Sequence, residues 1–373
     1  MEPFKNLISE DVVTLIGLHL SKAMPDLDQD AFIASILPHL DALELKQRVQ
    51  FISEQMLTVL PSDVRERNKT LVTMLHPDKL TSAGKPSSED GLCGWGIWPL
   101  TDVIGRSGLD DLDNSMSALK EFTMRGTSEF DVRPFIAADP SRAMSIMLDW
   151  AGDSNEHVRR LASEGSRPRL PWGMQLKSLI TDPTLTMPIL KALRDDPSEY
   201  VRRSVANHLN DIAKDHPDLV AKIAGEWMQG ASKDRQKLVR HACRSLIKQG
   251  HKETLAVFGL GPPSIAEPQI HIVTPTVEFG KTLEFNVTLS SSSQKPQKLL
   301  IDYVVHHHKA NGTLAPKVFK WKQTSLQPNE KSTLTRKHPM RPITTRKYYQ
   351  GQHALSLRIN GQDFGWVGFE LEI

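Results

Sequence analysis

Two segments of this 373-residue chain repeat one pattern of charged residues whose spacing suits binding or catalysis. DSNEHVRRLAS begins at Asp153 and DPSEYVRRSVA begins at Asp196, so the pattern recurs at an offset of 43 residues. That offset lies in the HEAT and armadillo range of roughly 40–47 residues. LVRHACRSL (238–246) is a weaker third copy. The repeat predicts stacked helix pairs, each burying its apolar face against its neighbours.

Helical spacing places the apolar and polar residues of the repeat on different faces. Val158, Leu161 and Ala162 point inward, and the remaining positions form a polar stripe on each copy. The two stripes consist of Glu156, Arg159, Arg160, Ser163, Glu164 and Arg167, and of Glu199, Arg202, Arg203, Asn207 and Asn210. Arginines on the concave surface of a solenoid suit phosphate groups, so we expect these stripes to bind DNA. The alternative is structural: Asp153 and Asp196 cap the helices, and the arginines pair with carboxylates of the next helix.

A short loop, ASEGSRPRLPWG (162–173), follows the first copy. Gly165 is predicted to end the helix in a left-handed conformation, and two prolines then favour an extended path. Arg167, Arg169 and Trp172 would project from this loop as a phosphate clamp with a stacking or wedging ring. The alternative is that Trp172 covers a core and Glu164 pairs with a neighbouring arginine.

The segments that must position these residues fall into two regions. Residues 1–260 repeat apolar residues every three to four positions, with an N-terminal helical bundle to about residue 90 and a loop at 81–94. GLGPPSIAEP (259–268) is a Pro/Gly-rich linker, and residues 268–373 carry about seven short strand-like runs. The predicted fold is therefore mainly α, a HEAT-like helical repeat solenoid followed by a C-terminal all-β immunoglobulin-like sandwich.

The net charge of +2 hides an uneven distribution along the chain. Residues 268–373 hold fourteen Lys and Arg against seven Asp and Glu, which favours an acidic partner such as nucleic acid. Within them RKHPMRPITTRK (336–347) contains no acid. Its expected DNA contacts are Arg336, Lys337, His338, Arg341, Thr344, Thr345, Arg346 and Lys347. The alternative is a charged strand edge that prevents aggregation.

The composition argues against disulfide-rich, zinc-binding, secreted and membrane proteins. Cys93 and Cys243 are far apart in the sequence and outside any CxxC pair, so neither a disulfide framework nor a structural zinc site is expected. No secretory signal and no uncharged apolar run of 18 residues is present. We therefore expect a protein of the reducing cytoplasm that is not in the membrane.

Several long segments resemble one known family. RLASEGSRPRLPWG (160–173), VRRSVANHLNDIAKDHPDLV (201–220), WPLTDVIGRSGLDDLDNSMSALKEFT (98–123) and SEFDVRPF (128–135) are similar to the AlkC family of bacterial DNA alkylation-repair glycosylases. KVFKWK (317–322) and the segment 336–353 resemble the immunoglobulin-like extension of one AlkC branch. The resemblance covers most of the chain from about residue 95.

The resemblance implies hydrolysis of the N-glycosidic bond of cationic bases, chiefly 3-methyladenine and also 3-methylcytosine, without flipping the base into a deep pocket. It also implies double-stranded DNA as the partner, a monomer, and no metal or organic cofactor. The oxocarbenium-like transition state requires a carboxylate and benefits from an aromatic face. The candidate catalytic residues are Glu156, Glu121, Glu164 and Trp172. Glu121 has an alternative role, an ion pair with Arg125 one helical turn away.

A second function remains open at this stage. HEAT solenoids are often scaffolds, and a fold does not determine a function. The alternative is a non-catalytic protein that uses its helical face and its sandwich to hold nucleic acid or a protein.

Overall fold

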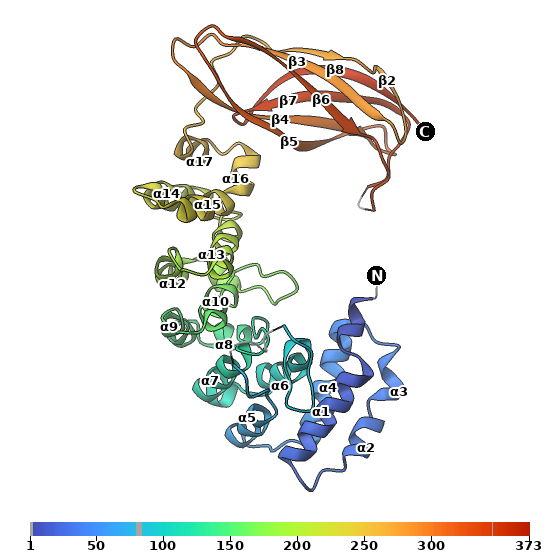
Figure 1. Cartoon of the computed structure of the whole chain (residues 1–373), viewed down its shortest axis with the longest axis vertical. Coiled ribbons are helices and arrows are strands. Elements are labelled where there is room, and N and C mark those ends of the chain that lie inside the picture. Colours follow the sequence, from blue (N-terminus) through green and yellow to red (C-terminus); the bar gives the residue numbers. More distant parts are fainter. Residues whose placement is uncertain (1–2, 80–83, 345) are drawn as a thin grey trace. The chain divides into compact units, whose positions relative to one another are not determined.

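The computed structural model describes residues 3–79, 84–344 and 346–373. Helices occupy the chain up to Val257, and strands occupy it from Gln269 onward (Figure 1). An N-terminal helical region is thus followed by a β-sheet domain with immunoglobulin-like architecture, as the sequence predicted. Among the described residues, no helix combines the length and the apolar character needed to cross a bilayer.

The first helices form around a small apolar core that includes Ile16 and Leu20. The helices are α1 (Glu10–Ala23), α2 (Gln29–Ala34), α3 (Leu37–Leu40), α4 (Leu45–Val59) and α5 (Val64–Thr73), preceded by a 3-10 turn at Phe4–Leu7. The side chains of Ser9 and Asp63 cap α1 and α5 by accepting hydrogen bonds from backbone N–H groups of the first helical turn. Because α4 packs against α6 (Trp98–Ser107), this region and the repeats that follow belong to one compact unit.

The repeat region continues with helices that stack on their sequence neighbours. They are α7 (Leu112–Thr123), α8 (Arg133–Ala138), α9 (Pro140–Trp150), α10 (Glu156–Glu164), α11 (Lys177–Thr181), α12 (Met187–Leu193), α13 (Glu199–Ile212) and α15 (Lys233–Ala242). Short 3-10 turns occupy Gly94–Ile97, Leu109–Asp111 and Thr184–Thr186. Helix α10 packs against α9 and α13, and α13 packs against α15. Val158 and Val201, equivalent in the repeat, are both fully buried, which confirms the predicted apolar face.

The predicted helix starts are wrong by two residues. The N-caps are Asn155 and Ser198. The side chain of Asp153 accepts a hydrogen bond from the backbone N–H of Asn155 at 2.8 Å, and that of Asp196 accepts one from Ser198 at 2.9 Å. Each aspartate thus forms an Asx turn that leads into the helix. Glu156 is consequently the first residue of α10.

The predicted left-handed cap at Gly165 is also wrong, because its φ is −64°. A Cβ at this position would lie 2.6 Å from Cγ2 of Val132 and 3.0 Å from the carbonyl oxygen of Leu161. Glycine is therefore needed for close packing rather than for its backbone conformation.

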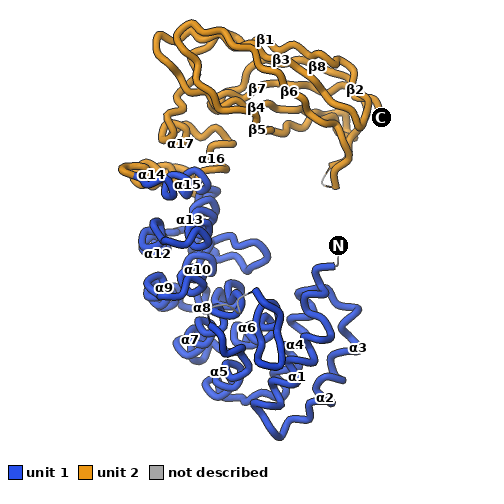
Figure 2. The backbone as a smooth tube through the Cα atoms, viewed as in Figure 1, with its two compact units in different colours: residues 1–215, 231–242 blue, residues 216–230, 243–373 orange. Residues whose placement is uncertain are grey.

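Contacts divide the chain into two compact units, shown in different colours in Figure 2. Unit 1 comprises residues 1–215 and 231–242, and unit 2 comprises residues 216–230 and 243–373. Unit 2 thus includes α14 (Pro217–Met228), α16 (Arg244–Gln249) and α17 (Lys252–Val257) together with the strands. Helix α14 packs against α17 within this unit.

The β region forms two sheets around a core that includes Phe285 and Leu355. One sheet has the strand order β1-β3-β6 and the other has the order β2-β8-β7-β4-β5. The described residues hold eight strands: β1 (Gln269–Ile272), β2 (Thr276–Glu278), β3 (Thr282–Ser290), β4 (Gln297–His308), β5 (Leu314–Leu326), β6 (Lys331–Pro339), β7 (Gly351–Ile359) and β8 (Gln362–Glu372). The first strand-like run, QIHIVTPTVEF (269–279), forms two strands rather than one, since β1 pairs with β3 whereas β2 pairs in parallel with β8 of the other sheet.

Candidate functional site

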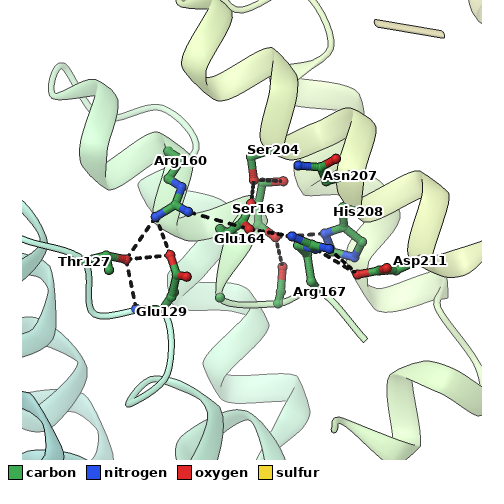
Figure 3. A network of polar contacts seen from close by, with 12 residues as sticks. Thr127, Glu129, Arg160, Ser163, Glu164, Arg167, Ser204, Asn207, His208 and Asp211 are labelled. Carbon is green, nitrogen blue, oxygen red and sulfur yellow. Dashed lines mark hydrogen bonds and ion pairs between the residues drawn. The ribbon is translucent and has the colours of Figure 1, made fainter. Parts of the chain in front are cut away.

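Arg160 lies at the centre of a polar network that joins α10 to the segment before α8 (Figure 3). Its guanidinium contacts the carboxylate of Glu129, donates to Thr127 Oγ1 at 3.0 Å and lies 3.6 Å from Glu164. It also lies 5.2 Å from the ring centre of Tyr200. Burial would lower the pKa of Arg160, but the two carboxylates raise it, so this cation is held firmly charged.

Glu164 lies in the interior of this network rather than on a surface. The residue is 6 % exposed, and its carboxylate accepts hydrogen bonds from Arg167 and Ser204, both at 2.6 Å (Figure 3). Arg167 in turn contacts Asp211 at 2.8 Å. Burial would raise the pKa of Glu164, but Arg160, Arg167 and the Ser204 hydroxyl outweigh burial and lower it. This geometry is the alternative left open by the sequence, a carboxylate paired with arginines inside the protein.

The other arginines of the predicted stripes are paired as well. Arg159 donates to both oxygens of Asp196, at 2.6 and 3.0 Å, and so joins the two repeats. The remaining pairs are Arg202 with Asp234, Arg203 with Glu199, and Arg169 with Asp215. Asn207 bonds to His241 at 2.9 Å, and Asn210 is buried. Any phosphate contact by these arginines must therefore share or break an existing ion pair.

A cavity of about 470 Å³ opens beside Arg160. Its walls are largely aromatic: Trp98 stacks on Phe130 at 5.0 Å, and Trp95 and Tyr200 are each about 40 % exposed. The complete lining is Gly84, Gly94, Trp95, Trp98, Thr123, Gly126, Thr127, Glu129, Phe130, His157, Arg160 and Tyr200. Sequence reasoning missed this cavity, because its walls come from four separate segments of the chain.

Glu156 is the one exposed carboxylate among the three catalytic candidates. It bonds to the hydroxyl of Ser198, and its neighbour His157 lines the cavity. Glu156 lies at the N-terminus of α10 and, with Arg159 and Ser198, lines a separate pocket that shares His157 with the aromatic cavity.

Glu121 lies on α7 and is half-buried. It contacts Lys79 at 2.8 Å and Arg125 at 3.2 Å. Burial would raise the pKa of Glu121, but these two cations lower it. The predicted alternative, a pair with Arg125 one turn away, is thus present, and Glu121 does not line the aromatic cavity.

Three residues of the loop after α10 were predicted to project into solvent, and one of them is largely exposed. Arg167 is buried and Arg169 is held by Asp215 at 2.8 Å, so the prediction that both project from the loop is wrong for Arg167. Trp172 is 58 % exposed, so it does not cover a core.

The basic segment of unit 2 divides between two environments. His338 is 5 % exposed and bonds to the buried hydroxyl of Tyr303 at 2.9 Å, so the expected DNA contact by His338 is wrong. Arg336 lies over the same Tyr303 ring, because it shares the inward face of β6. The outward residues are Lys337, Arg341, Thr344 and Lys347. Arg346 is half-buried against His307, and Thr345 lies outside the described residues.

Comparison with known proteins supports an assignment to one family. Residues 128–251 match the model of the DNA alkylation repair enzyme, and residues 266–373 match the C-terminal Ig-like domain of the uncharacterised protein YhaZ. The chain is 37% identical over 366 residues to YhaZ of Bacillus subtilis, covering 97% of both chains. It also matches the Pseudomonas fluorescens alkylpurine DNA glycosylase AlkC bound to DNA containing an abasic site analog, with 35% identity, a TM-score of 0.83 and complete coverage of both chains. The chain belongs to the AlkC-like family of DNA alkylation repair enzymes.

The resemblance seen in the sequence is thereby confirmed, including the Ig-like domain of this AlkC-like branch. The matched segment 128–251 contains Glu129, Glu156 and Arg160. Trp95 and Trp98 precede it, although they form part of the same cavity. The AlkC-like chain thus combines family-matched residues with neighbouring aromatic rings in one site.

Proposed function

We propose that this protein is a DNA glycosylase that hydrolyses the N-glycosidic bond of cationic alkylated bases, 3-methyladenine and also 3-methylcytosine. The observation that carries the proposal is the exposed carboxylate of Glu156, in a pocket that shares His157 with the aromatic cavity, in a chain similar to an AlkC bound to DNA containing an abasic site analog. The substrate is double-stranded DNA, and the enzyme acts as a monomer in the cytoplasm.

The chemistry requires little from the protein. A methylated base already carries positive charge and leaves as a neutral molecule, so no strong general acid is needed. As the bond breaks, positive charge develops on the deoxyribose, and a nearby carboxylate stabilises it and positions a water molecule. We assign this role to Glu156. Because Glu156 is on the surface, it can reach the sugar without the base entering a deep pocket.

The aromatic contribution comes from the cavity in this proposal. The faces of Trp95 and Tyr200 attract cationic centres through their negative π electron density. Trp172 does not line the cavity, so it does not contribute to this aromatic face. Glu121 and Glu164 are each held by two cations, which weakens their ability to stabilise a new positive charge.

The test is release of free base from a methylated DNA duplex by the purified protein, measured by chromatography. We expect Glu156→Gln to reduce release at least ~100-fold while DNA affinity stays within about threefold. Glu199→Gln is the matched control, because Glu199 occupies the same position in the next repeat and is exposed. If Glu156→Gln retains activity, the carboxylate is elsewhere. Salt-dependent DNA binding with no base release at high enzyme concentration would instead favour the non-catalytic scaffold.

A further inference from the structure

The glycine that ends α16 lies directly against the hairpin that joins β7 to β8, and both belong to unit 2 (Figure 2). Gly250 ends the helix in a left-handed conformation with a φ of 81°. The hairpin consists of Asn360 and Gly361, with φ values of 45° and 81°, the pattern of a type I′ turn. A Cβ on Gly250 would lie 2.5 Å from the Cα of Gly361, and a Cβ on Gly361 would lie 2.6 Å from the Cα of Gly250. Because each obstacle is backbone, this close approach requires glycine on both sides.

Asn360 ties the hairpin to two further segments of unit 2. Its side-chain amide donates to the carbonyl oxygen of Lys298, on β4, at 3.0 Å and to that of Gly261, in the segment after α17, at 2.7 Å. Its side-chain oxygen accepts a hydrogen bond from the backbone N–H of Leu300 at 2.7 Å. Asn360 is buried, so these bonds are shielded from water. The hairpin is thus fixed on its sheet, and its turn presents Gly361 to the end of α16.

The Pro/Gly-rich segment 259–268 is also bonded to the sandwich. Ser264 and Gln297 exchange two hydrogen bonds, at 2.9 and 2.8 Å. The Glu267 carboxylate accepts a hydrogen bond from the backbone N–H of Gly365 at 3.1 Å. This segment is therefore not a free spacer between α17 and the strands. Linked domains move relative to one another unless contacts hold them, so the hairpin contact decides whether the sandwich can swing.

We propose that the contact between Gly250 and Gly361 locks α16, α17 and the sandwich into one rigid body and so fixes the direction in which the basic strands face a DNA duplex. Neither glycine touches DNA in this proposal, and both are positioning residues for the cations of the sandwich. A rigidly held domain binds more tightly than a swinging one, because less orientational freedom is lost on binding. The rigidity of the junction is independent of the proposed function, whereas its effect on DNA binding rests on that function.

The rigidity is tested on the full chain by double electron–electron resonance, with nitroxide labels at Ala256→Cys on α17 and Lys331→Cys on β6. Both positions are exposed, and the two native cysteines are buried. We expect one narrow distribution of label distances when both glycines are present. Gly361→Ala should broaden this distribution, because the backbone of Gly250 blocks the added methyl group and the hairpin must leave the contact.

Gly312→Ala is the matched control for the hairpin. Gly312 has a φ of 79° in the turn after β4, and no atom of the described residues lies within 4 Å of an added Cβ. Its alanine variant carries the same backbone strain and should leave the distribution narrow. Gly250→Ala and Gly230→Ala form a second pair on the helix side, because Gly230 has a φ of 60° and equally open space among the described residues. This second pair decides the question if Gly361→Ala disturbs the folding of the sheet.

The consequence for DNA is measured by anisotropy of a fluorescent duplex that carries one tetrahydrofuran abasic-site analogue. We expect Gly361→Ala and Gly250→Ala to bind this duplex about tenfold more weakly, and the two controls to bind it within about twofold of the unaltered protein. Adding the duplex should narrow the broadened distance distribution again, because binding selects one orientation of the sandwich. Damage to the fold alone would not be reversed by DNA in this way.

The lock is refuted if Gly361→Ala and Gly250→Ala give distributions as narrow as their controls, or if the distribution is already broad with both glycines present. The positioning role is refuted if the distributions broaden while the affinity for the duplex stays unchanged. The proposed glycosylase function fails separately, if the unaltered protein binds this duplex but releases no base from a methylated duplex.

Discussion

Asp131 follows the cavity-lining residues Glu129 and Phe130 in the sequence, and its protonation state can be tested through the pH dependence of protein stability. It lies in the family-matched segment SEFDVRPF, is 6 % exposed, and has one oxygen, Oδ2, without a hydrogen-bond partner. Burial raises its pKa to about 8, against about 3.9 in an unfolded chain. The folded protein therefore keeps a proton on Asp131 at neutral pH, whereas the unfolded chain releases it.

The sign and size of the effect follow from this difference. The stability that Asp131 contributes is fully present below about pH 4 and is lost as the pH rises through about 8, because only the folded state holds the proton. Each pH unit in this window removes about 1.4 kcal/mol. Between pH 5 and pH 7 the loss from this one group is about 3 kcal/mol.

Asp131→Asn removes the titration while keeping the shape of the side chain. We measure the free energy of unfolding by urea denaturation followed by circular dichroism. The difference between Asp131→Asn and the unaltered protein should shift by about 3 kcal/mol in favour of the variant when the pH is raised from 5 to 7. Asp90→Asn, at an exposed aspartate, controls for the substitution itself. Parallel pH dependence in the two proteins would refute the reasoning, because Asp131 would then be ionised in the folded state.

Three further predictions concern packing and charge. Glu164→Gln should lower the free energy of unfolding by about 3 kcal/mol in urea titrations, because it leaves buried arginines short of a partner, whereas Glu199→Gln should change it by less than about 0.5 kcal/mol. Arg341→Ala should weaken DNA binding equally for all sequences and reduce the slope of log affinity against log salt by about one, as measured by anisotropy. Gly165→Ala should lower the melting temperature through its clash with the residues around it, while Gly152→Ala, whose nearest neighbour would be at 3.6 Å, should not.

The architecture followed from sequence patterns because it depends on local periodicity. Apolar spacing located the buried faces of α10 and α13, and alternating runs located the strands. The helix starts were harder, since Asp153, Ser154 and Asn155 are consecutive residues that can all act as caps. Only the three-dimensional path shows that Asn155 caps the helix and Asp153 forms the preceding turn.

The candidate site was less predictable because its contacts join distant parts of the chain. The sequence predicted a polar face for Arg159 and Arg167, but Asp196 and Asp211, with which they pair, are 37 and 44 residues away, on the next repeat. The aromatic cavity has no local signature at all. Trp98 and Tyr200 are about one hundred residues apart and meet there only through the stacking of successive helices.

The two carboxylates of α10 show why a polar stripe does not by itself locate a catalytic group. Glu156 and Glu164 begin and end the same helix, about 12 Å apart at ~1.5 Å per residue. Glu164 is buried and its charge is neutralised by two arginines, so this carboxylate stabilises the fold. Glu156 is exposed and bonds only to a neutral hydroxyl among the contacts described, so its charge remains available to a cationic sugar. The same Glu→Gln change should therefore lower stability at one end of α10 and activity at the other.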